Sequence, residues 1–234
     1  SLNHQWEIDR KSYLSTSLYM SLGRGGGYSG QGNDKFSPYS YSSWNGAYKG
    51  ALNTTFRRPD GTFDYAAIED YNASSEYGSA LVMSESKNEH VWYGLLSTYT
   101  TKFGENFDFY GGVDFRYYKG THTNVISDLF GGEYYMDNAD RLKVKAANNA
   151  AAADPMWAYQ KLYVGDVVYR DYDGYVMQEG AFFQLEYNKD KLAAFVSGSL
   201  SNTGYWRVDR FYYDKEHDCL LYTSDAADDL IGVD

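Results

Sequence analysis

The chain has 234 residues and a formal net charge of −11, with 26 tyrosines and only 3 prolines. This charge argues against a nucleic-acid-binding protein, which would normally carry a basic stripe. Aromatic residues make up 18% of the chain and favour the pleated, half-buried surface of a β-sheet. The mean hydropathy of −0.59 and the lack of an apolar run of about 18 residues exclude a membrane-spanning helix, but not a β-barrel, whose lipid-facing residues alternate with polar ones.

The first predicted strand with a clear period covers residues 13–22, after a short strand-like stretch at residues 4–8. Its side chains alternate between two faces, as the period of two in a β-strand requires. One face carries the uncharged residues Leu14, Thr16, Leu18, Met20 and Leu22. The pattern predicts a strand with an uncharged outer face.

Residues 24–89 show no sustained period and are rich in Gly, Ser, Tyr and Asn, so a long connection is predicted there. The glycines at positions 25, 27 and 30 match the spacing of the dinucleotide-binding pattern. No helical period follows them, so no helix N-terminus would face a pyrophosphate. We therefore predict no cofactor.

Residues 90–119 predict one long hairpin, which is the clearest pattern in the chain. After a turn at residues 104–107, the second arm has one uncharged and one charged face. Each arm matches the roughly 9–11 residues of a tilted membrane-crossing strand. The uncharged face of the second arm consists of Phe109, Gly111, Val113, Phe115 and Tyr117.

A second long connection is predicted from there to about residue 174. Within it, the alanine-rich residues 146–153 are followed by Asp154 and Pro155, which predicts a short helix stopped by proline. Residues 177–200 then alternate as a final hairpin, and its last strand continues toward Tyr213. The whole pattern predicts about five to six strands.

Short turns alternate with long connections along the chain, as they do in outer-membrane barrels. Loops longer than about 12–15 residues are uncommon in compact domains. Turning the charged face of the hairpin outward would place an arginine in hydrocarbon, at a cost of roughly 2–4 kcal/mol at the midplane. The uncharged faces are therefore predicted to contact lipid. The polar residues predicted to face the lumen are Asp108, Asp114, Arg116 and Glu186.

The predicted fold class is all-β: an antiparallel up-and-down meander, an open fragment of a transmembrane β-barrel with long external loops and a short helix in the second loop. Residues 13–27, 164–175 and 201–210 resemble the barrel of TonB-dependent outer-membrane receptors, and the resemblance extends over residues 1–218. It implies a barrel of about 22 strands, plugged by an N-terminal domain, in a Gram-negative outer membrane. Such a receptor imports a siderophore, a vitamin or a glycan with energy passed on by TonB. The plug and the TonB-contacting segment would lie outside this chain.

External loops would capture the ligand of such a receptor. The loop aromatic residues that could stack on a small molecule or a glycan are Tyr28, Tyr39, Tyr41, Trp44, Tyr48 and Trp157. Equally, such residues could pack against one another to hold a long loop compact. No catalytic residue is predicted, so the protein is not expected to be an enzyme. No metal site is predicted either, because Asp171 and Asp173 lack the remaining positions of a calcium loop and the four histidines are scattered.

Residues 219–234 begin with Cys-Leu-Leu-Tyr-Thr-Ser-Asp-Ala-Ala-Asp-Asp. This run is similar to the translation of a transposase adapter used to prepare sequencing libraries. We therefore predict a non-native tail after a partial receptor barrel at residues 1–218, with the natural C-terminus beyond the sequence. The tail holds the only cysteine, so no disulfide is expected elsewhere. Residues 1–9 lack the features of a secretory signal, so either the natural N-terminus lies upstream or the protein is not exported.

Two other functions stay open from the sequence. A secreted β-sandwich that binds or cleaves glycans would show the same alternation, and the sequons at Asn53 and Asn72 are compatible with secretion. A porin or adhesin barrel without TonB coupling would share the lipid-facing strands. The partners expected under the main hypothesis are outer-membrane lipid, the protein's own plug domain, TonB and a small-molecule or glycan ligand, with no nucleic acid.

Overall fold

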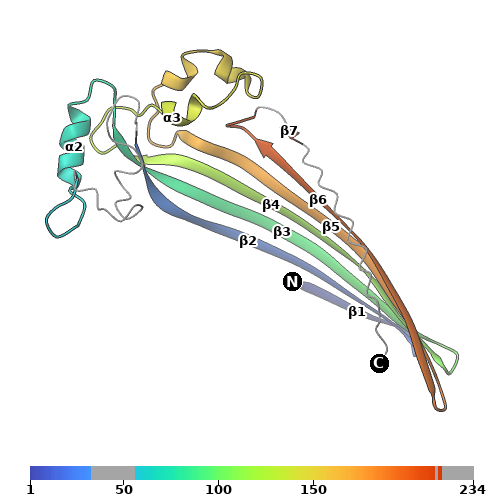
Figure 1. Cartoon of the computed structure of the whole chain (residues 1–234). Coiled ribbons are helices and arrows are strands. Elements are labelled where there is room, and N and C mark those ends of the chain that lie inside the picture. Colours follow the sequence, from blue (N-terminus) through green and yellow to red (C-terminus); the bar gives the residue numbers. More distant parts are fainter. Residues whose placement is uncertain (33–55, 214–215, 218–234) are drawn as a thin grey trace, which may run out of the picture.

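The computed structural model describes residues 1–32, 56–213 and 216–217. All described strands belong to one seven-stranded antiparallel sheet, in which each strand pairs with the next one along the chain. The strands are β1 (Leu2–Asp9), β2 (Ser12–Gly32), β3 (Leu81–Phe103), β4 (Phe107–Asp128), β5 (Val167–Lys189), β6 (Leu192–Asp209) and β7 (Glu216–His217). The predicted all-β, up-and-down meander is thus confirmed. Figure 1 shows a long curved sheet with its tight turns at one end and its helices at the other.

The strand register brings the predicted uncharged sets onto one face of the sheet. Leu18 of β2 pairs with Leu95 of β3, which pairs with Phe115 of β4. The same row continues to Glu179 of β5 and Asn202 of β6. Because side chains alternate with a period of two, one row of paired residues determines on which face of the sheet all the remaining rows lie. We call this side of the sheet the uncharged face.

The strands are longer than the hydrophobic pattern predicts. β2 continues through its glycines to Gly32 and pairs residue by residue with β3 from Leu81 onward. The predicted loop at residues 24–89 was therefore wrong at both ends, because backbone ladders form without any hydrophobic alternation. The second connection is shorter for the same reason, since β4 ends at Asp128 and β5 begins at Val167. Both corrections move residues from predicted loops into the sheet.

Both edges of the sheet are open within the part of the chain that the structure describes. β1 pairs with β2 only from Ser12 to Leu18, so the rest of β2 presents an unpaired edge on that side. On the other side, β6 pairs with β7 only at Arg207 and Val208. Unpaired edges expose backbone donors and acceptors that another strand can use. This open sheet is what the sequence predicted for an incomplete meander.

All helices of the described residues lie in the two long connections. The first connection holds α2 (Tyr65–Ala73), which the sequence did not predict and which begins at the N-cap Asp64. The second holds α3 (Asn138–Arg141), η1 (Ala150–Ala153) and η2 (Trp157–Tyr159). The short helix predicted for the alanine-rich stretch is the 3₁₀ turn η1. None of the helices in the described ranges is long and apolar enough to cross a membrane.

Among the residues that the structure describes, the buried hydrophobic side chains lie at the loop end of the sheet. One cluster joins α2 to the start of β3 and consists of Phe56, Ile68, Leu81 and Phe130. A second cluster joins the second connection to β3, β4 and β5 and consists of Val82, Ile126, Tyr135, Leu162 and Val168. Along the rest of the described strands, no hydrophobic side chain is fully buried. The long connections therefore form a packed cap, whereas the long arm of the sheet has no core.

A single asparagine ties this cap together. The side chain of Asn72 on α2 is 1% exposed, and its amide nitrogen donates to the carbonyls of Leu81, Leu129 and Phe130 at 2.8, 3.0 and 3.1 Å. Its carbonyl oxygen accepts from the backbone of Ala80 and Leu81 at 2.9 and 3.3 Å. The sequon at Asn72 is therefore not an accessible glycosylation site in this fold, because the amide is buried and fully used.

We expect Asn72→Ala to destabilise the cap by about 2–4 kcal/mol, because several buried backbone groups would lose their partners together. Hydrogen exchange of the Ala80 and Leu81 amides should accelerate accordingly. Asn188→Ala, at the exposed end of β5 next to the β5–β6 turn, is the matched control and should leave this exchange unchanged. Equal exchange in all three proteins would contradict the assignment.

Candidate functional site

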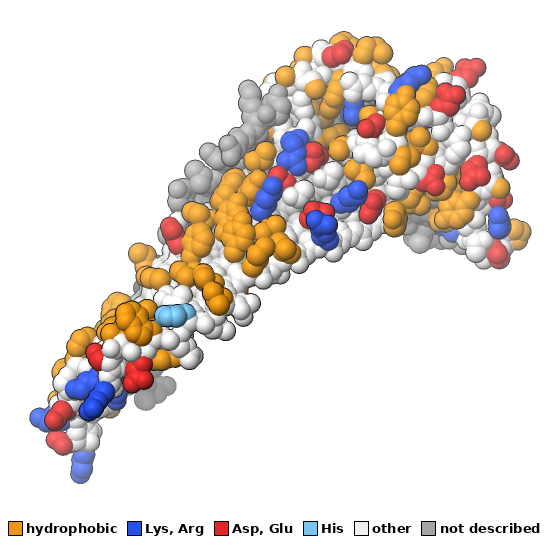
Figure 2. Space-filling view, turned by 180° about the vertical axis from the view of Figure 1, so that it is seen from behind, with side chains coloured by type: hydrophobic (Ala, Val, Ile, Leu, Met, Phe, Trp, Pro, Cys, Tyr) orange, Lys and Arg blue, Asp and Glu red, His pale blue; other side chains and the backbone are white. Residues whose placement is uncertain are grey.

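The uncharged face combines large apolar side chains that stay in contact with solvent and few charged side chains, whereas the opposite face carries both exposed apolar and charged side chains. Leu200 is 78% exposed, Leu22 is 65% exposed and Val113 is 47% exposed. Figure 2 shows hydrophobic side chains gathered along the arm of the sheet, with basic and acidic side chains next to one another toward the helical end. Contiguous apolar patches of this kind are rare on soluble monomers and mark a surface that something else covers.

Aromatic side chains border the uncharged face at both ends. Near the tight turns, the rings of Phe107 and Tyr187 lie 4.9 Å apart, and Phe103 contacts Phe109 at 6.3 Å. Near the loop end, four rings from four adjacent strands form a row, which we call the upper aromatic row: Tyr93, Tyr117, Tyr175 and Trp206.

The number of residues between the two aromatic borders equals the number that a tilted strand needs to cross a bilayer. On β4 the apolar stretch runs from Phe107 to Tyr117, which matches the roughly 9–11 residues that a tilted strand needs to cross a bilayer. In the upper aromatic row, Tyr93 stacks on Tyr117 at 5.3 Å and Tyr175 on Trp206 at 5.0 Å. Tyrosine and tryptophan favour membrane–water interfaces, where an apolar ring and a polar tip are both satisfied.

Polar side chains between the two borders are satisfied within the sheet. Two hydroxyl pairs bridge β2 and β3 at 2.9 Å, Ser12 with Thr101 and Thr16 with Ser97. Between the borders, the described residues of β2 to β6 on this face include one acidic or basic side chain, Glu179, which accepts from the amide of Asn202 at 3.3 Å. The edge strand β1 adds His4, opposite Thr16, and Asp9, opposite Ser12 at the turn end. Internal pairing of this kind is what an apolar surrounding demands of polar groups.

Ion pairs begin immediately beyond the upper aromatic row. Lys119 contacts Asp173 at 3.2 Å, and Arg24 contacts Glu89 at 3.6 Å. Arg210, just after β6, reaches back to both Asp171 and Asp173, at 2.6 and 3.0 Å. The two β5 carboxylates are therefore neutralised by protein cations. No group of three or more potential metal ligands was found among the described residues.

The opposite face of the sheet carries the four polar residues that the sequence predicted for a lumen. Asp114 and Arg116 lie there on β4, opposite Gly180 and Gln178 of β5. Near the turn, Lys102 contacts Asp108 at 3.1 Å, and Gln184 donates to Glu186 at 2.6 Å. Their common face is established by the register, and a lumen on that side stays a prediction.

Two of the six predicted ligand-binding aromatic residues lie in the part of the chain that the structure describes, and they belong to different elements. Tyr28, placed in a loop by the sequence, lies on β2 with its side chain exposed. Trp157 lies in η2, where its ring contacts Phe211 at 6.0 Å and the guanidinium of Arg141 at 4.9 Å. Trp157 therefore helps hold the cap together. The remaining four residues, Tyr39, Tyr41, Trp44 and Tyr48, lie outside the described residues.

The structure assembles an aromatic and basic cluster that sequence reasoning missed. On the face opposite the uncharged one, Tyr118 stacks on His90 at 5.9 Å, and Tyr172 contacts His122 at 4.9 Å. The guanidinium of Arg207 lies 3.6 Å from the centre of the Tyr172 ring. The sequence does not reveal this cluster, because its residues come from four strands, β3 to β6, and only the strand register brings them together. Aromatic rings beside hydrogen-bonding groups can stack on a ligand and orient it.

One buried carboxyl links the second connection to β5. Asp137, at the start of α3, is 2% exposed and accepts a hydrogen bond from the backbone of Tyr169 at 2.8 Å. Burial raises the pKa of the Asp137 carboxyl from 3.8 to about 7. Tyr169 has a φ of 40°, a left-handed conformation that is unusual for a tyrosine, so this contact holds strained backbone.

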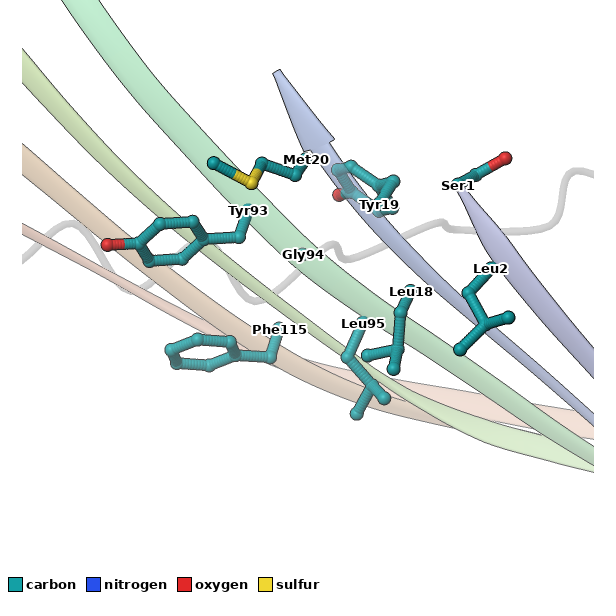
Figure 3. Close-up of a pocket in the computed structure, with 9 residues that line it drawn as sticks. All are labelled: Ser1, Leu2, Leu18, Tyr19, Met20, Tyr93, Gly94, Leu95 and Phe115. Atoms are coloured by element: carbon teal, nitrogen blue, oxygen red, sulfur yellow. The ribbon is translucent and has the colours of Figure 1, made fainter. Parts of the chain in front are cut away.

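A shallow hollow interrupts the uncharged face beside β1. It has a volume of about 430 Å³ and lies over four strands. Figure 3 shows Leu2, Leu18, Leu95 and Phe115 projecting to the same side from neighbouring strands around it. The lining has no convergent polar groups of the kind that orient a specific small molecule. It resembles the rest of the uncharged face in chemistry.

Neither family models, nor curated proteins, nor solved structures yielded a match to this chain. The functional argument therefore depends on the residues and their geometry.

We expect Asp137→Asn to remove a component of the pH dependence of stability. Because the pKa of the folded carboxyl is higher than its unfolded value of 3.8, the folded state binds the proton more tightly. This contribution to stability is fully present below about pH 4 and is lost as the pH rises through about 7. The difference between wild-type and variant unfolding free energies, measured by urea titration, should therefore change by up to about 1.4 kcal/mol per pH unit in that window. Parallel curves would refute a titrating carboxyl at this position.

Proposed function

We propose that this chain forms part of the wall of an outer-membrane β-barrel belonging to a TonB-dependent nutrient receptor. The observation that supports this most directly is the exposed uncharged face, bordered by aromatic side chains at both ends over one bilayer-crossing length. In water such a surface would be costly, whereas in a bilayer the lipid covers it.

The open edges support a partial wall. A transmembrane barrel must close so that every backbone group is paired, because hydrocarbon offers no hydrogen-bonding partners. Here β2 and β6 both present unpaired stretches, so further strands would have to continue the sheet on each side. That requirement fits a larger barrel, as does the resemblance of residues 1–218 of this chain to the barrel of such receptors.

The receptor assignment rests on the sequence resemblance together with the polar opposite face and the packed external cap. In this proposal the uncharged face contacts outer-membrane lipid, and the other face lines the interior next to a plug domain. The ligand would be a small molecule or a glycan, captured on the external side before TonB-driven opening. The cluster of His90, Tyr118, His122, Tyr172 and Arg207 is an additional candidate for contacting it. The protein would carry out transport and no chemistry.

The β-sandwich alternative would need a second layer over the uncharged face. All described strands belong to one sheet, and the apolar side chains of that face are exposed. This observation favours the membrane proposal over a secreted glycan-binding or glycan-cleaving sandwich. A porin or adhesin barrel would share the wall and differ in lacking a plug domain and TonB coupling.

The direct test is partition of the full chain between membrane and water. We expect it to fold in detergent micelles or lipid vesicles, to remain with the membrane after carbonate extraction and to show strand content that is lost without lipid. A soluble, cooperatively folded monomer in plain buffer would overturn the proposal.

Two neighbouring residues on β6 offer a sharper test. Leu200 lies on the uncharged face, in the row of Val113 and Ala181, whereas Ser199 lies on the opposite face. Leu200→Arg should destabilise the membrane-inserted protein by about 2–4 kcal/mol, the cost of arginine near the midplane. Ser199→Arg should be tolerated, because its side chain points away from lipid. If both variants insert and unfold like wild type in a urea titration of the vesicle-bound protein, the uncharged face is not in hydrocarbon.

A further inference from the structure

Five ion pairs lie on the uncharged side of the sheet just beyond the upper aromatic row, and we call their four basic members the cation rows. They come from four strands and the end of β6: Arg24 with Glu89, Lys87 with Glu85, Lys119 with Asp173, and Arg210 with both Asp171 and Asp173. The register places Lys119 beside Val91 and Tyr175, level with Trp206. The others follow within the next two rows toward the cap.

In every one of these pairs the cation is the more exposed partner. The side chain of Arg24 is 86% exposed against 50% for Glu89, and that of Lys87 is 49% exposed against 33% for Glu85. Lys119 is 38% exposed above Asp173 at 10%, and Arg210 is 43% exposed above Asp171 at 20%. The cation is therefore the more accessible partner in each pair, although each cation is paired with a carboxylate.

We infer that the cation rows bind the phosphate groups of anionic membrane lipids, an inference that rests on the proposed membrane function. In a bilayer, tyrosine and tryptophan lie at the level of the head groups, so the layer just beyond them meets lipid phosphates. Arginine and lysine are the side chains suited to phosphate, and basic clusters at a membrane surface attract anionic lipids. The carboxylates paired with these cations reduce the electrostatic repulsion between neighbouring basic side chains.

The two ends of the uncharged face differ in this respect. At the turn end, the ion pair of Lys102 with Asp108 lies on the opposite face of the sheet, away from the proposed lipid, and the uncharged face carries the single cation Lys189 on β5 rather than rows of ion pairs among the described residues. At the loop end, the ion pair of Arg207 with Asp209 also lies on the opposite face, so it is not part of the cation rows. The preference for anionic lipid is therefore expected at the loop end of the barrel wall, which is the external side in the proposed orientation.

The test compares lipid selectivity in vesicles. The full chain is inserted into phosphatidylcholine vesicles, and tryptophan quenching by brominated phosphatidylglycerol is compared with quenching by brominated phosphatidylcholine. Wild type should prefer phosphatidylglycerol. The double variant Arg24→Gln/Lys87→Gln should weaken this preference by about 5-fold for each cation removed, if each contributes about 1 kcal/mol at the surface. These two residues are chosen because Lys119 and Arg210 neutralise buried carboxylates, and their loss could unfold the sheet.

The matched control is Lys189→Gln/Lys191→Gln, which removes the same charge at the exposed turn end and should keep the wild-type preference. Equal quenching by both lipids in wild type, or an unchanged preference in Arg24→Gln/Lys87→Gln, would overturn the inference and leave membrane insertion standing. The preference for phosphatidylglycerol could also be lost on adding inorganic phosphate but not on adding chloride at equal ionic strength. That result would assign the cation rows to free phosphate and overturn the inference that they bind lipid phosphates. Failure of the wild-type chain to insert into either lipid would instead refute the proposed function itself.

Discussion

Backbone hydrogen bonding between neighbouring strands is the interaction on which this structure depends. Along the arm of the sheet no hydrophobic side chain of the described residues is fully buried, so no core holds the strands together there. The ladder itself is nearly continuous, with β2 and β3 paired from Ser12 and Thr101 to Gly32 and Leu81. Cross-strand contacts add to it, such as the stacked Tyr175 and Trp206. A sheet of this kind needs an apolar surrounding to supply the burial that its own chain does not provide.

At the loop end, hydrophobic packing and side-chain hydrogen bonds stabilise the structure. There, two hydrophobic clusters and the hydrogen bonds of Asn72 fold both long connections onto the starts of β3 and β5. Buried polar groups in this cap are hydrogen-bonded to backbone, which fixes its conformation more than apolar contact alone would. The cap therefore behaves as a small globular unit set on the end of a coreless sheet. In the proposed receptor, such a cap would keep the side chains of a ligand-capturing surface in place.

The division of charge across the sheet connects these two parts. Basic and acidic side chains are nearly absent between the aromatic borders of the uncharged face, and they appear in pairs as soon as the upper aromatic row is passed. On the opposite face, charged residues such as Asp114 and Arg116 occur at the same depth. The same sheet thus satisfies two different surroundings at once, which is possible because consecutive side chains point to opposite sides.

Much of the sheet followed from the sequence alone. The alternation at residues 13–22, 90–119 and 177–200 determined which residues are strands and which faces are uncharged, because a period of two is a local property of the chain. The face shared by Asp108, Asp114, Arg116 and Glu186 followed from the same rule. The glycine-rich extension of β2 and the start of β3 could not be found in this way, since backbone pairing there carries no hydrophobic signal.

Only the tertiary structure decided which residues meet. Register joined Tyr93, Tyr117, Tyr175 and Trp206 from four strands into a row. It also brought Tyr118 and His122 of β4 together with His90 of β3 and Tyr172 of β5. Folding also gave Trp157 and Asn72 structural partners that local patterns do not encode. The sequence by itself determined the periodicity of each strand, because that depends on neighbouring residues. The tertiary structure determined the clusters, because they depend on long-range pairing that the chain establishes only as a whole.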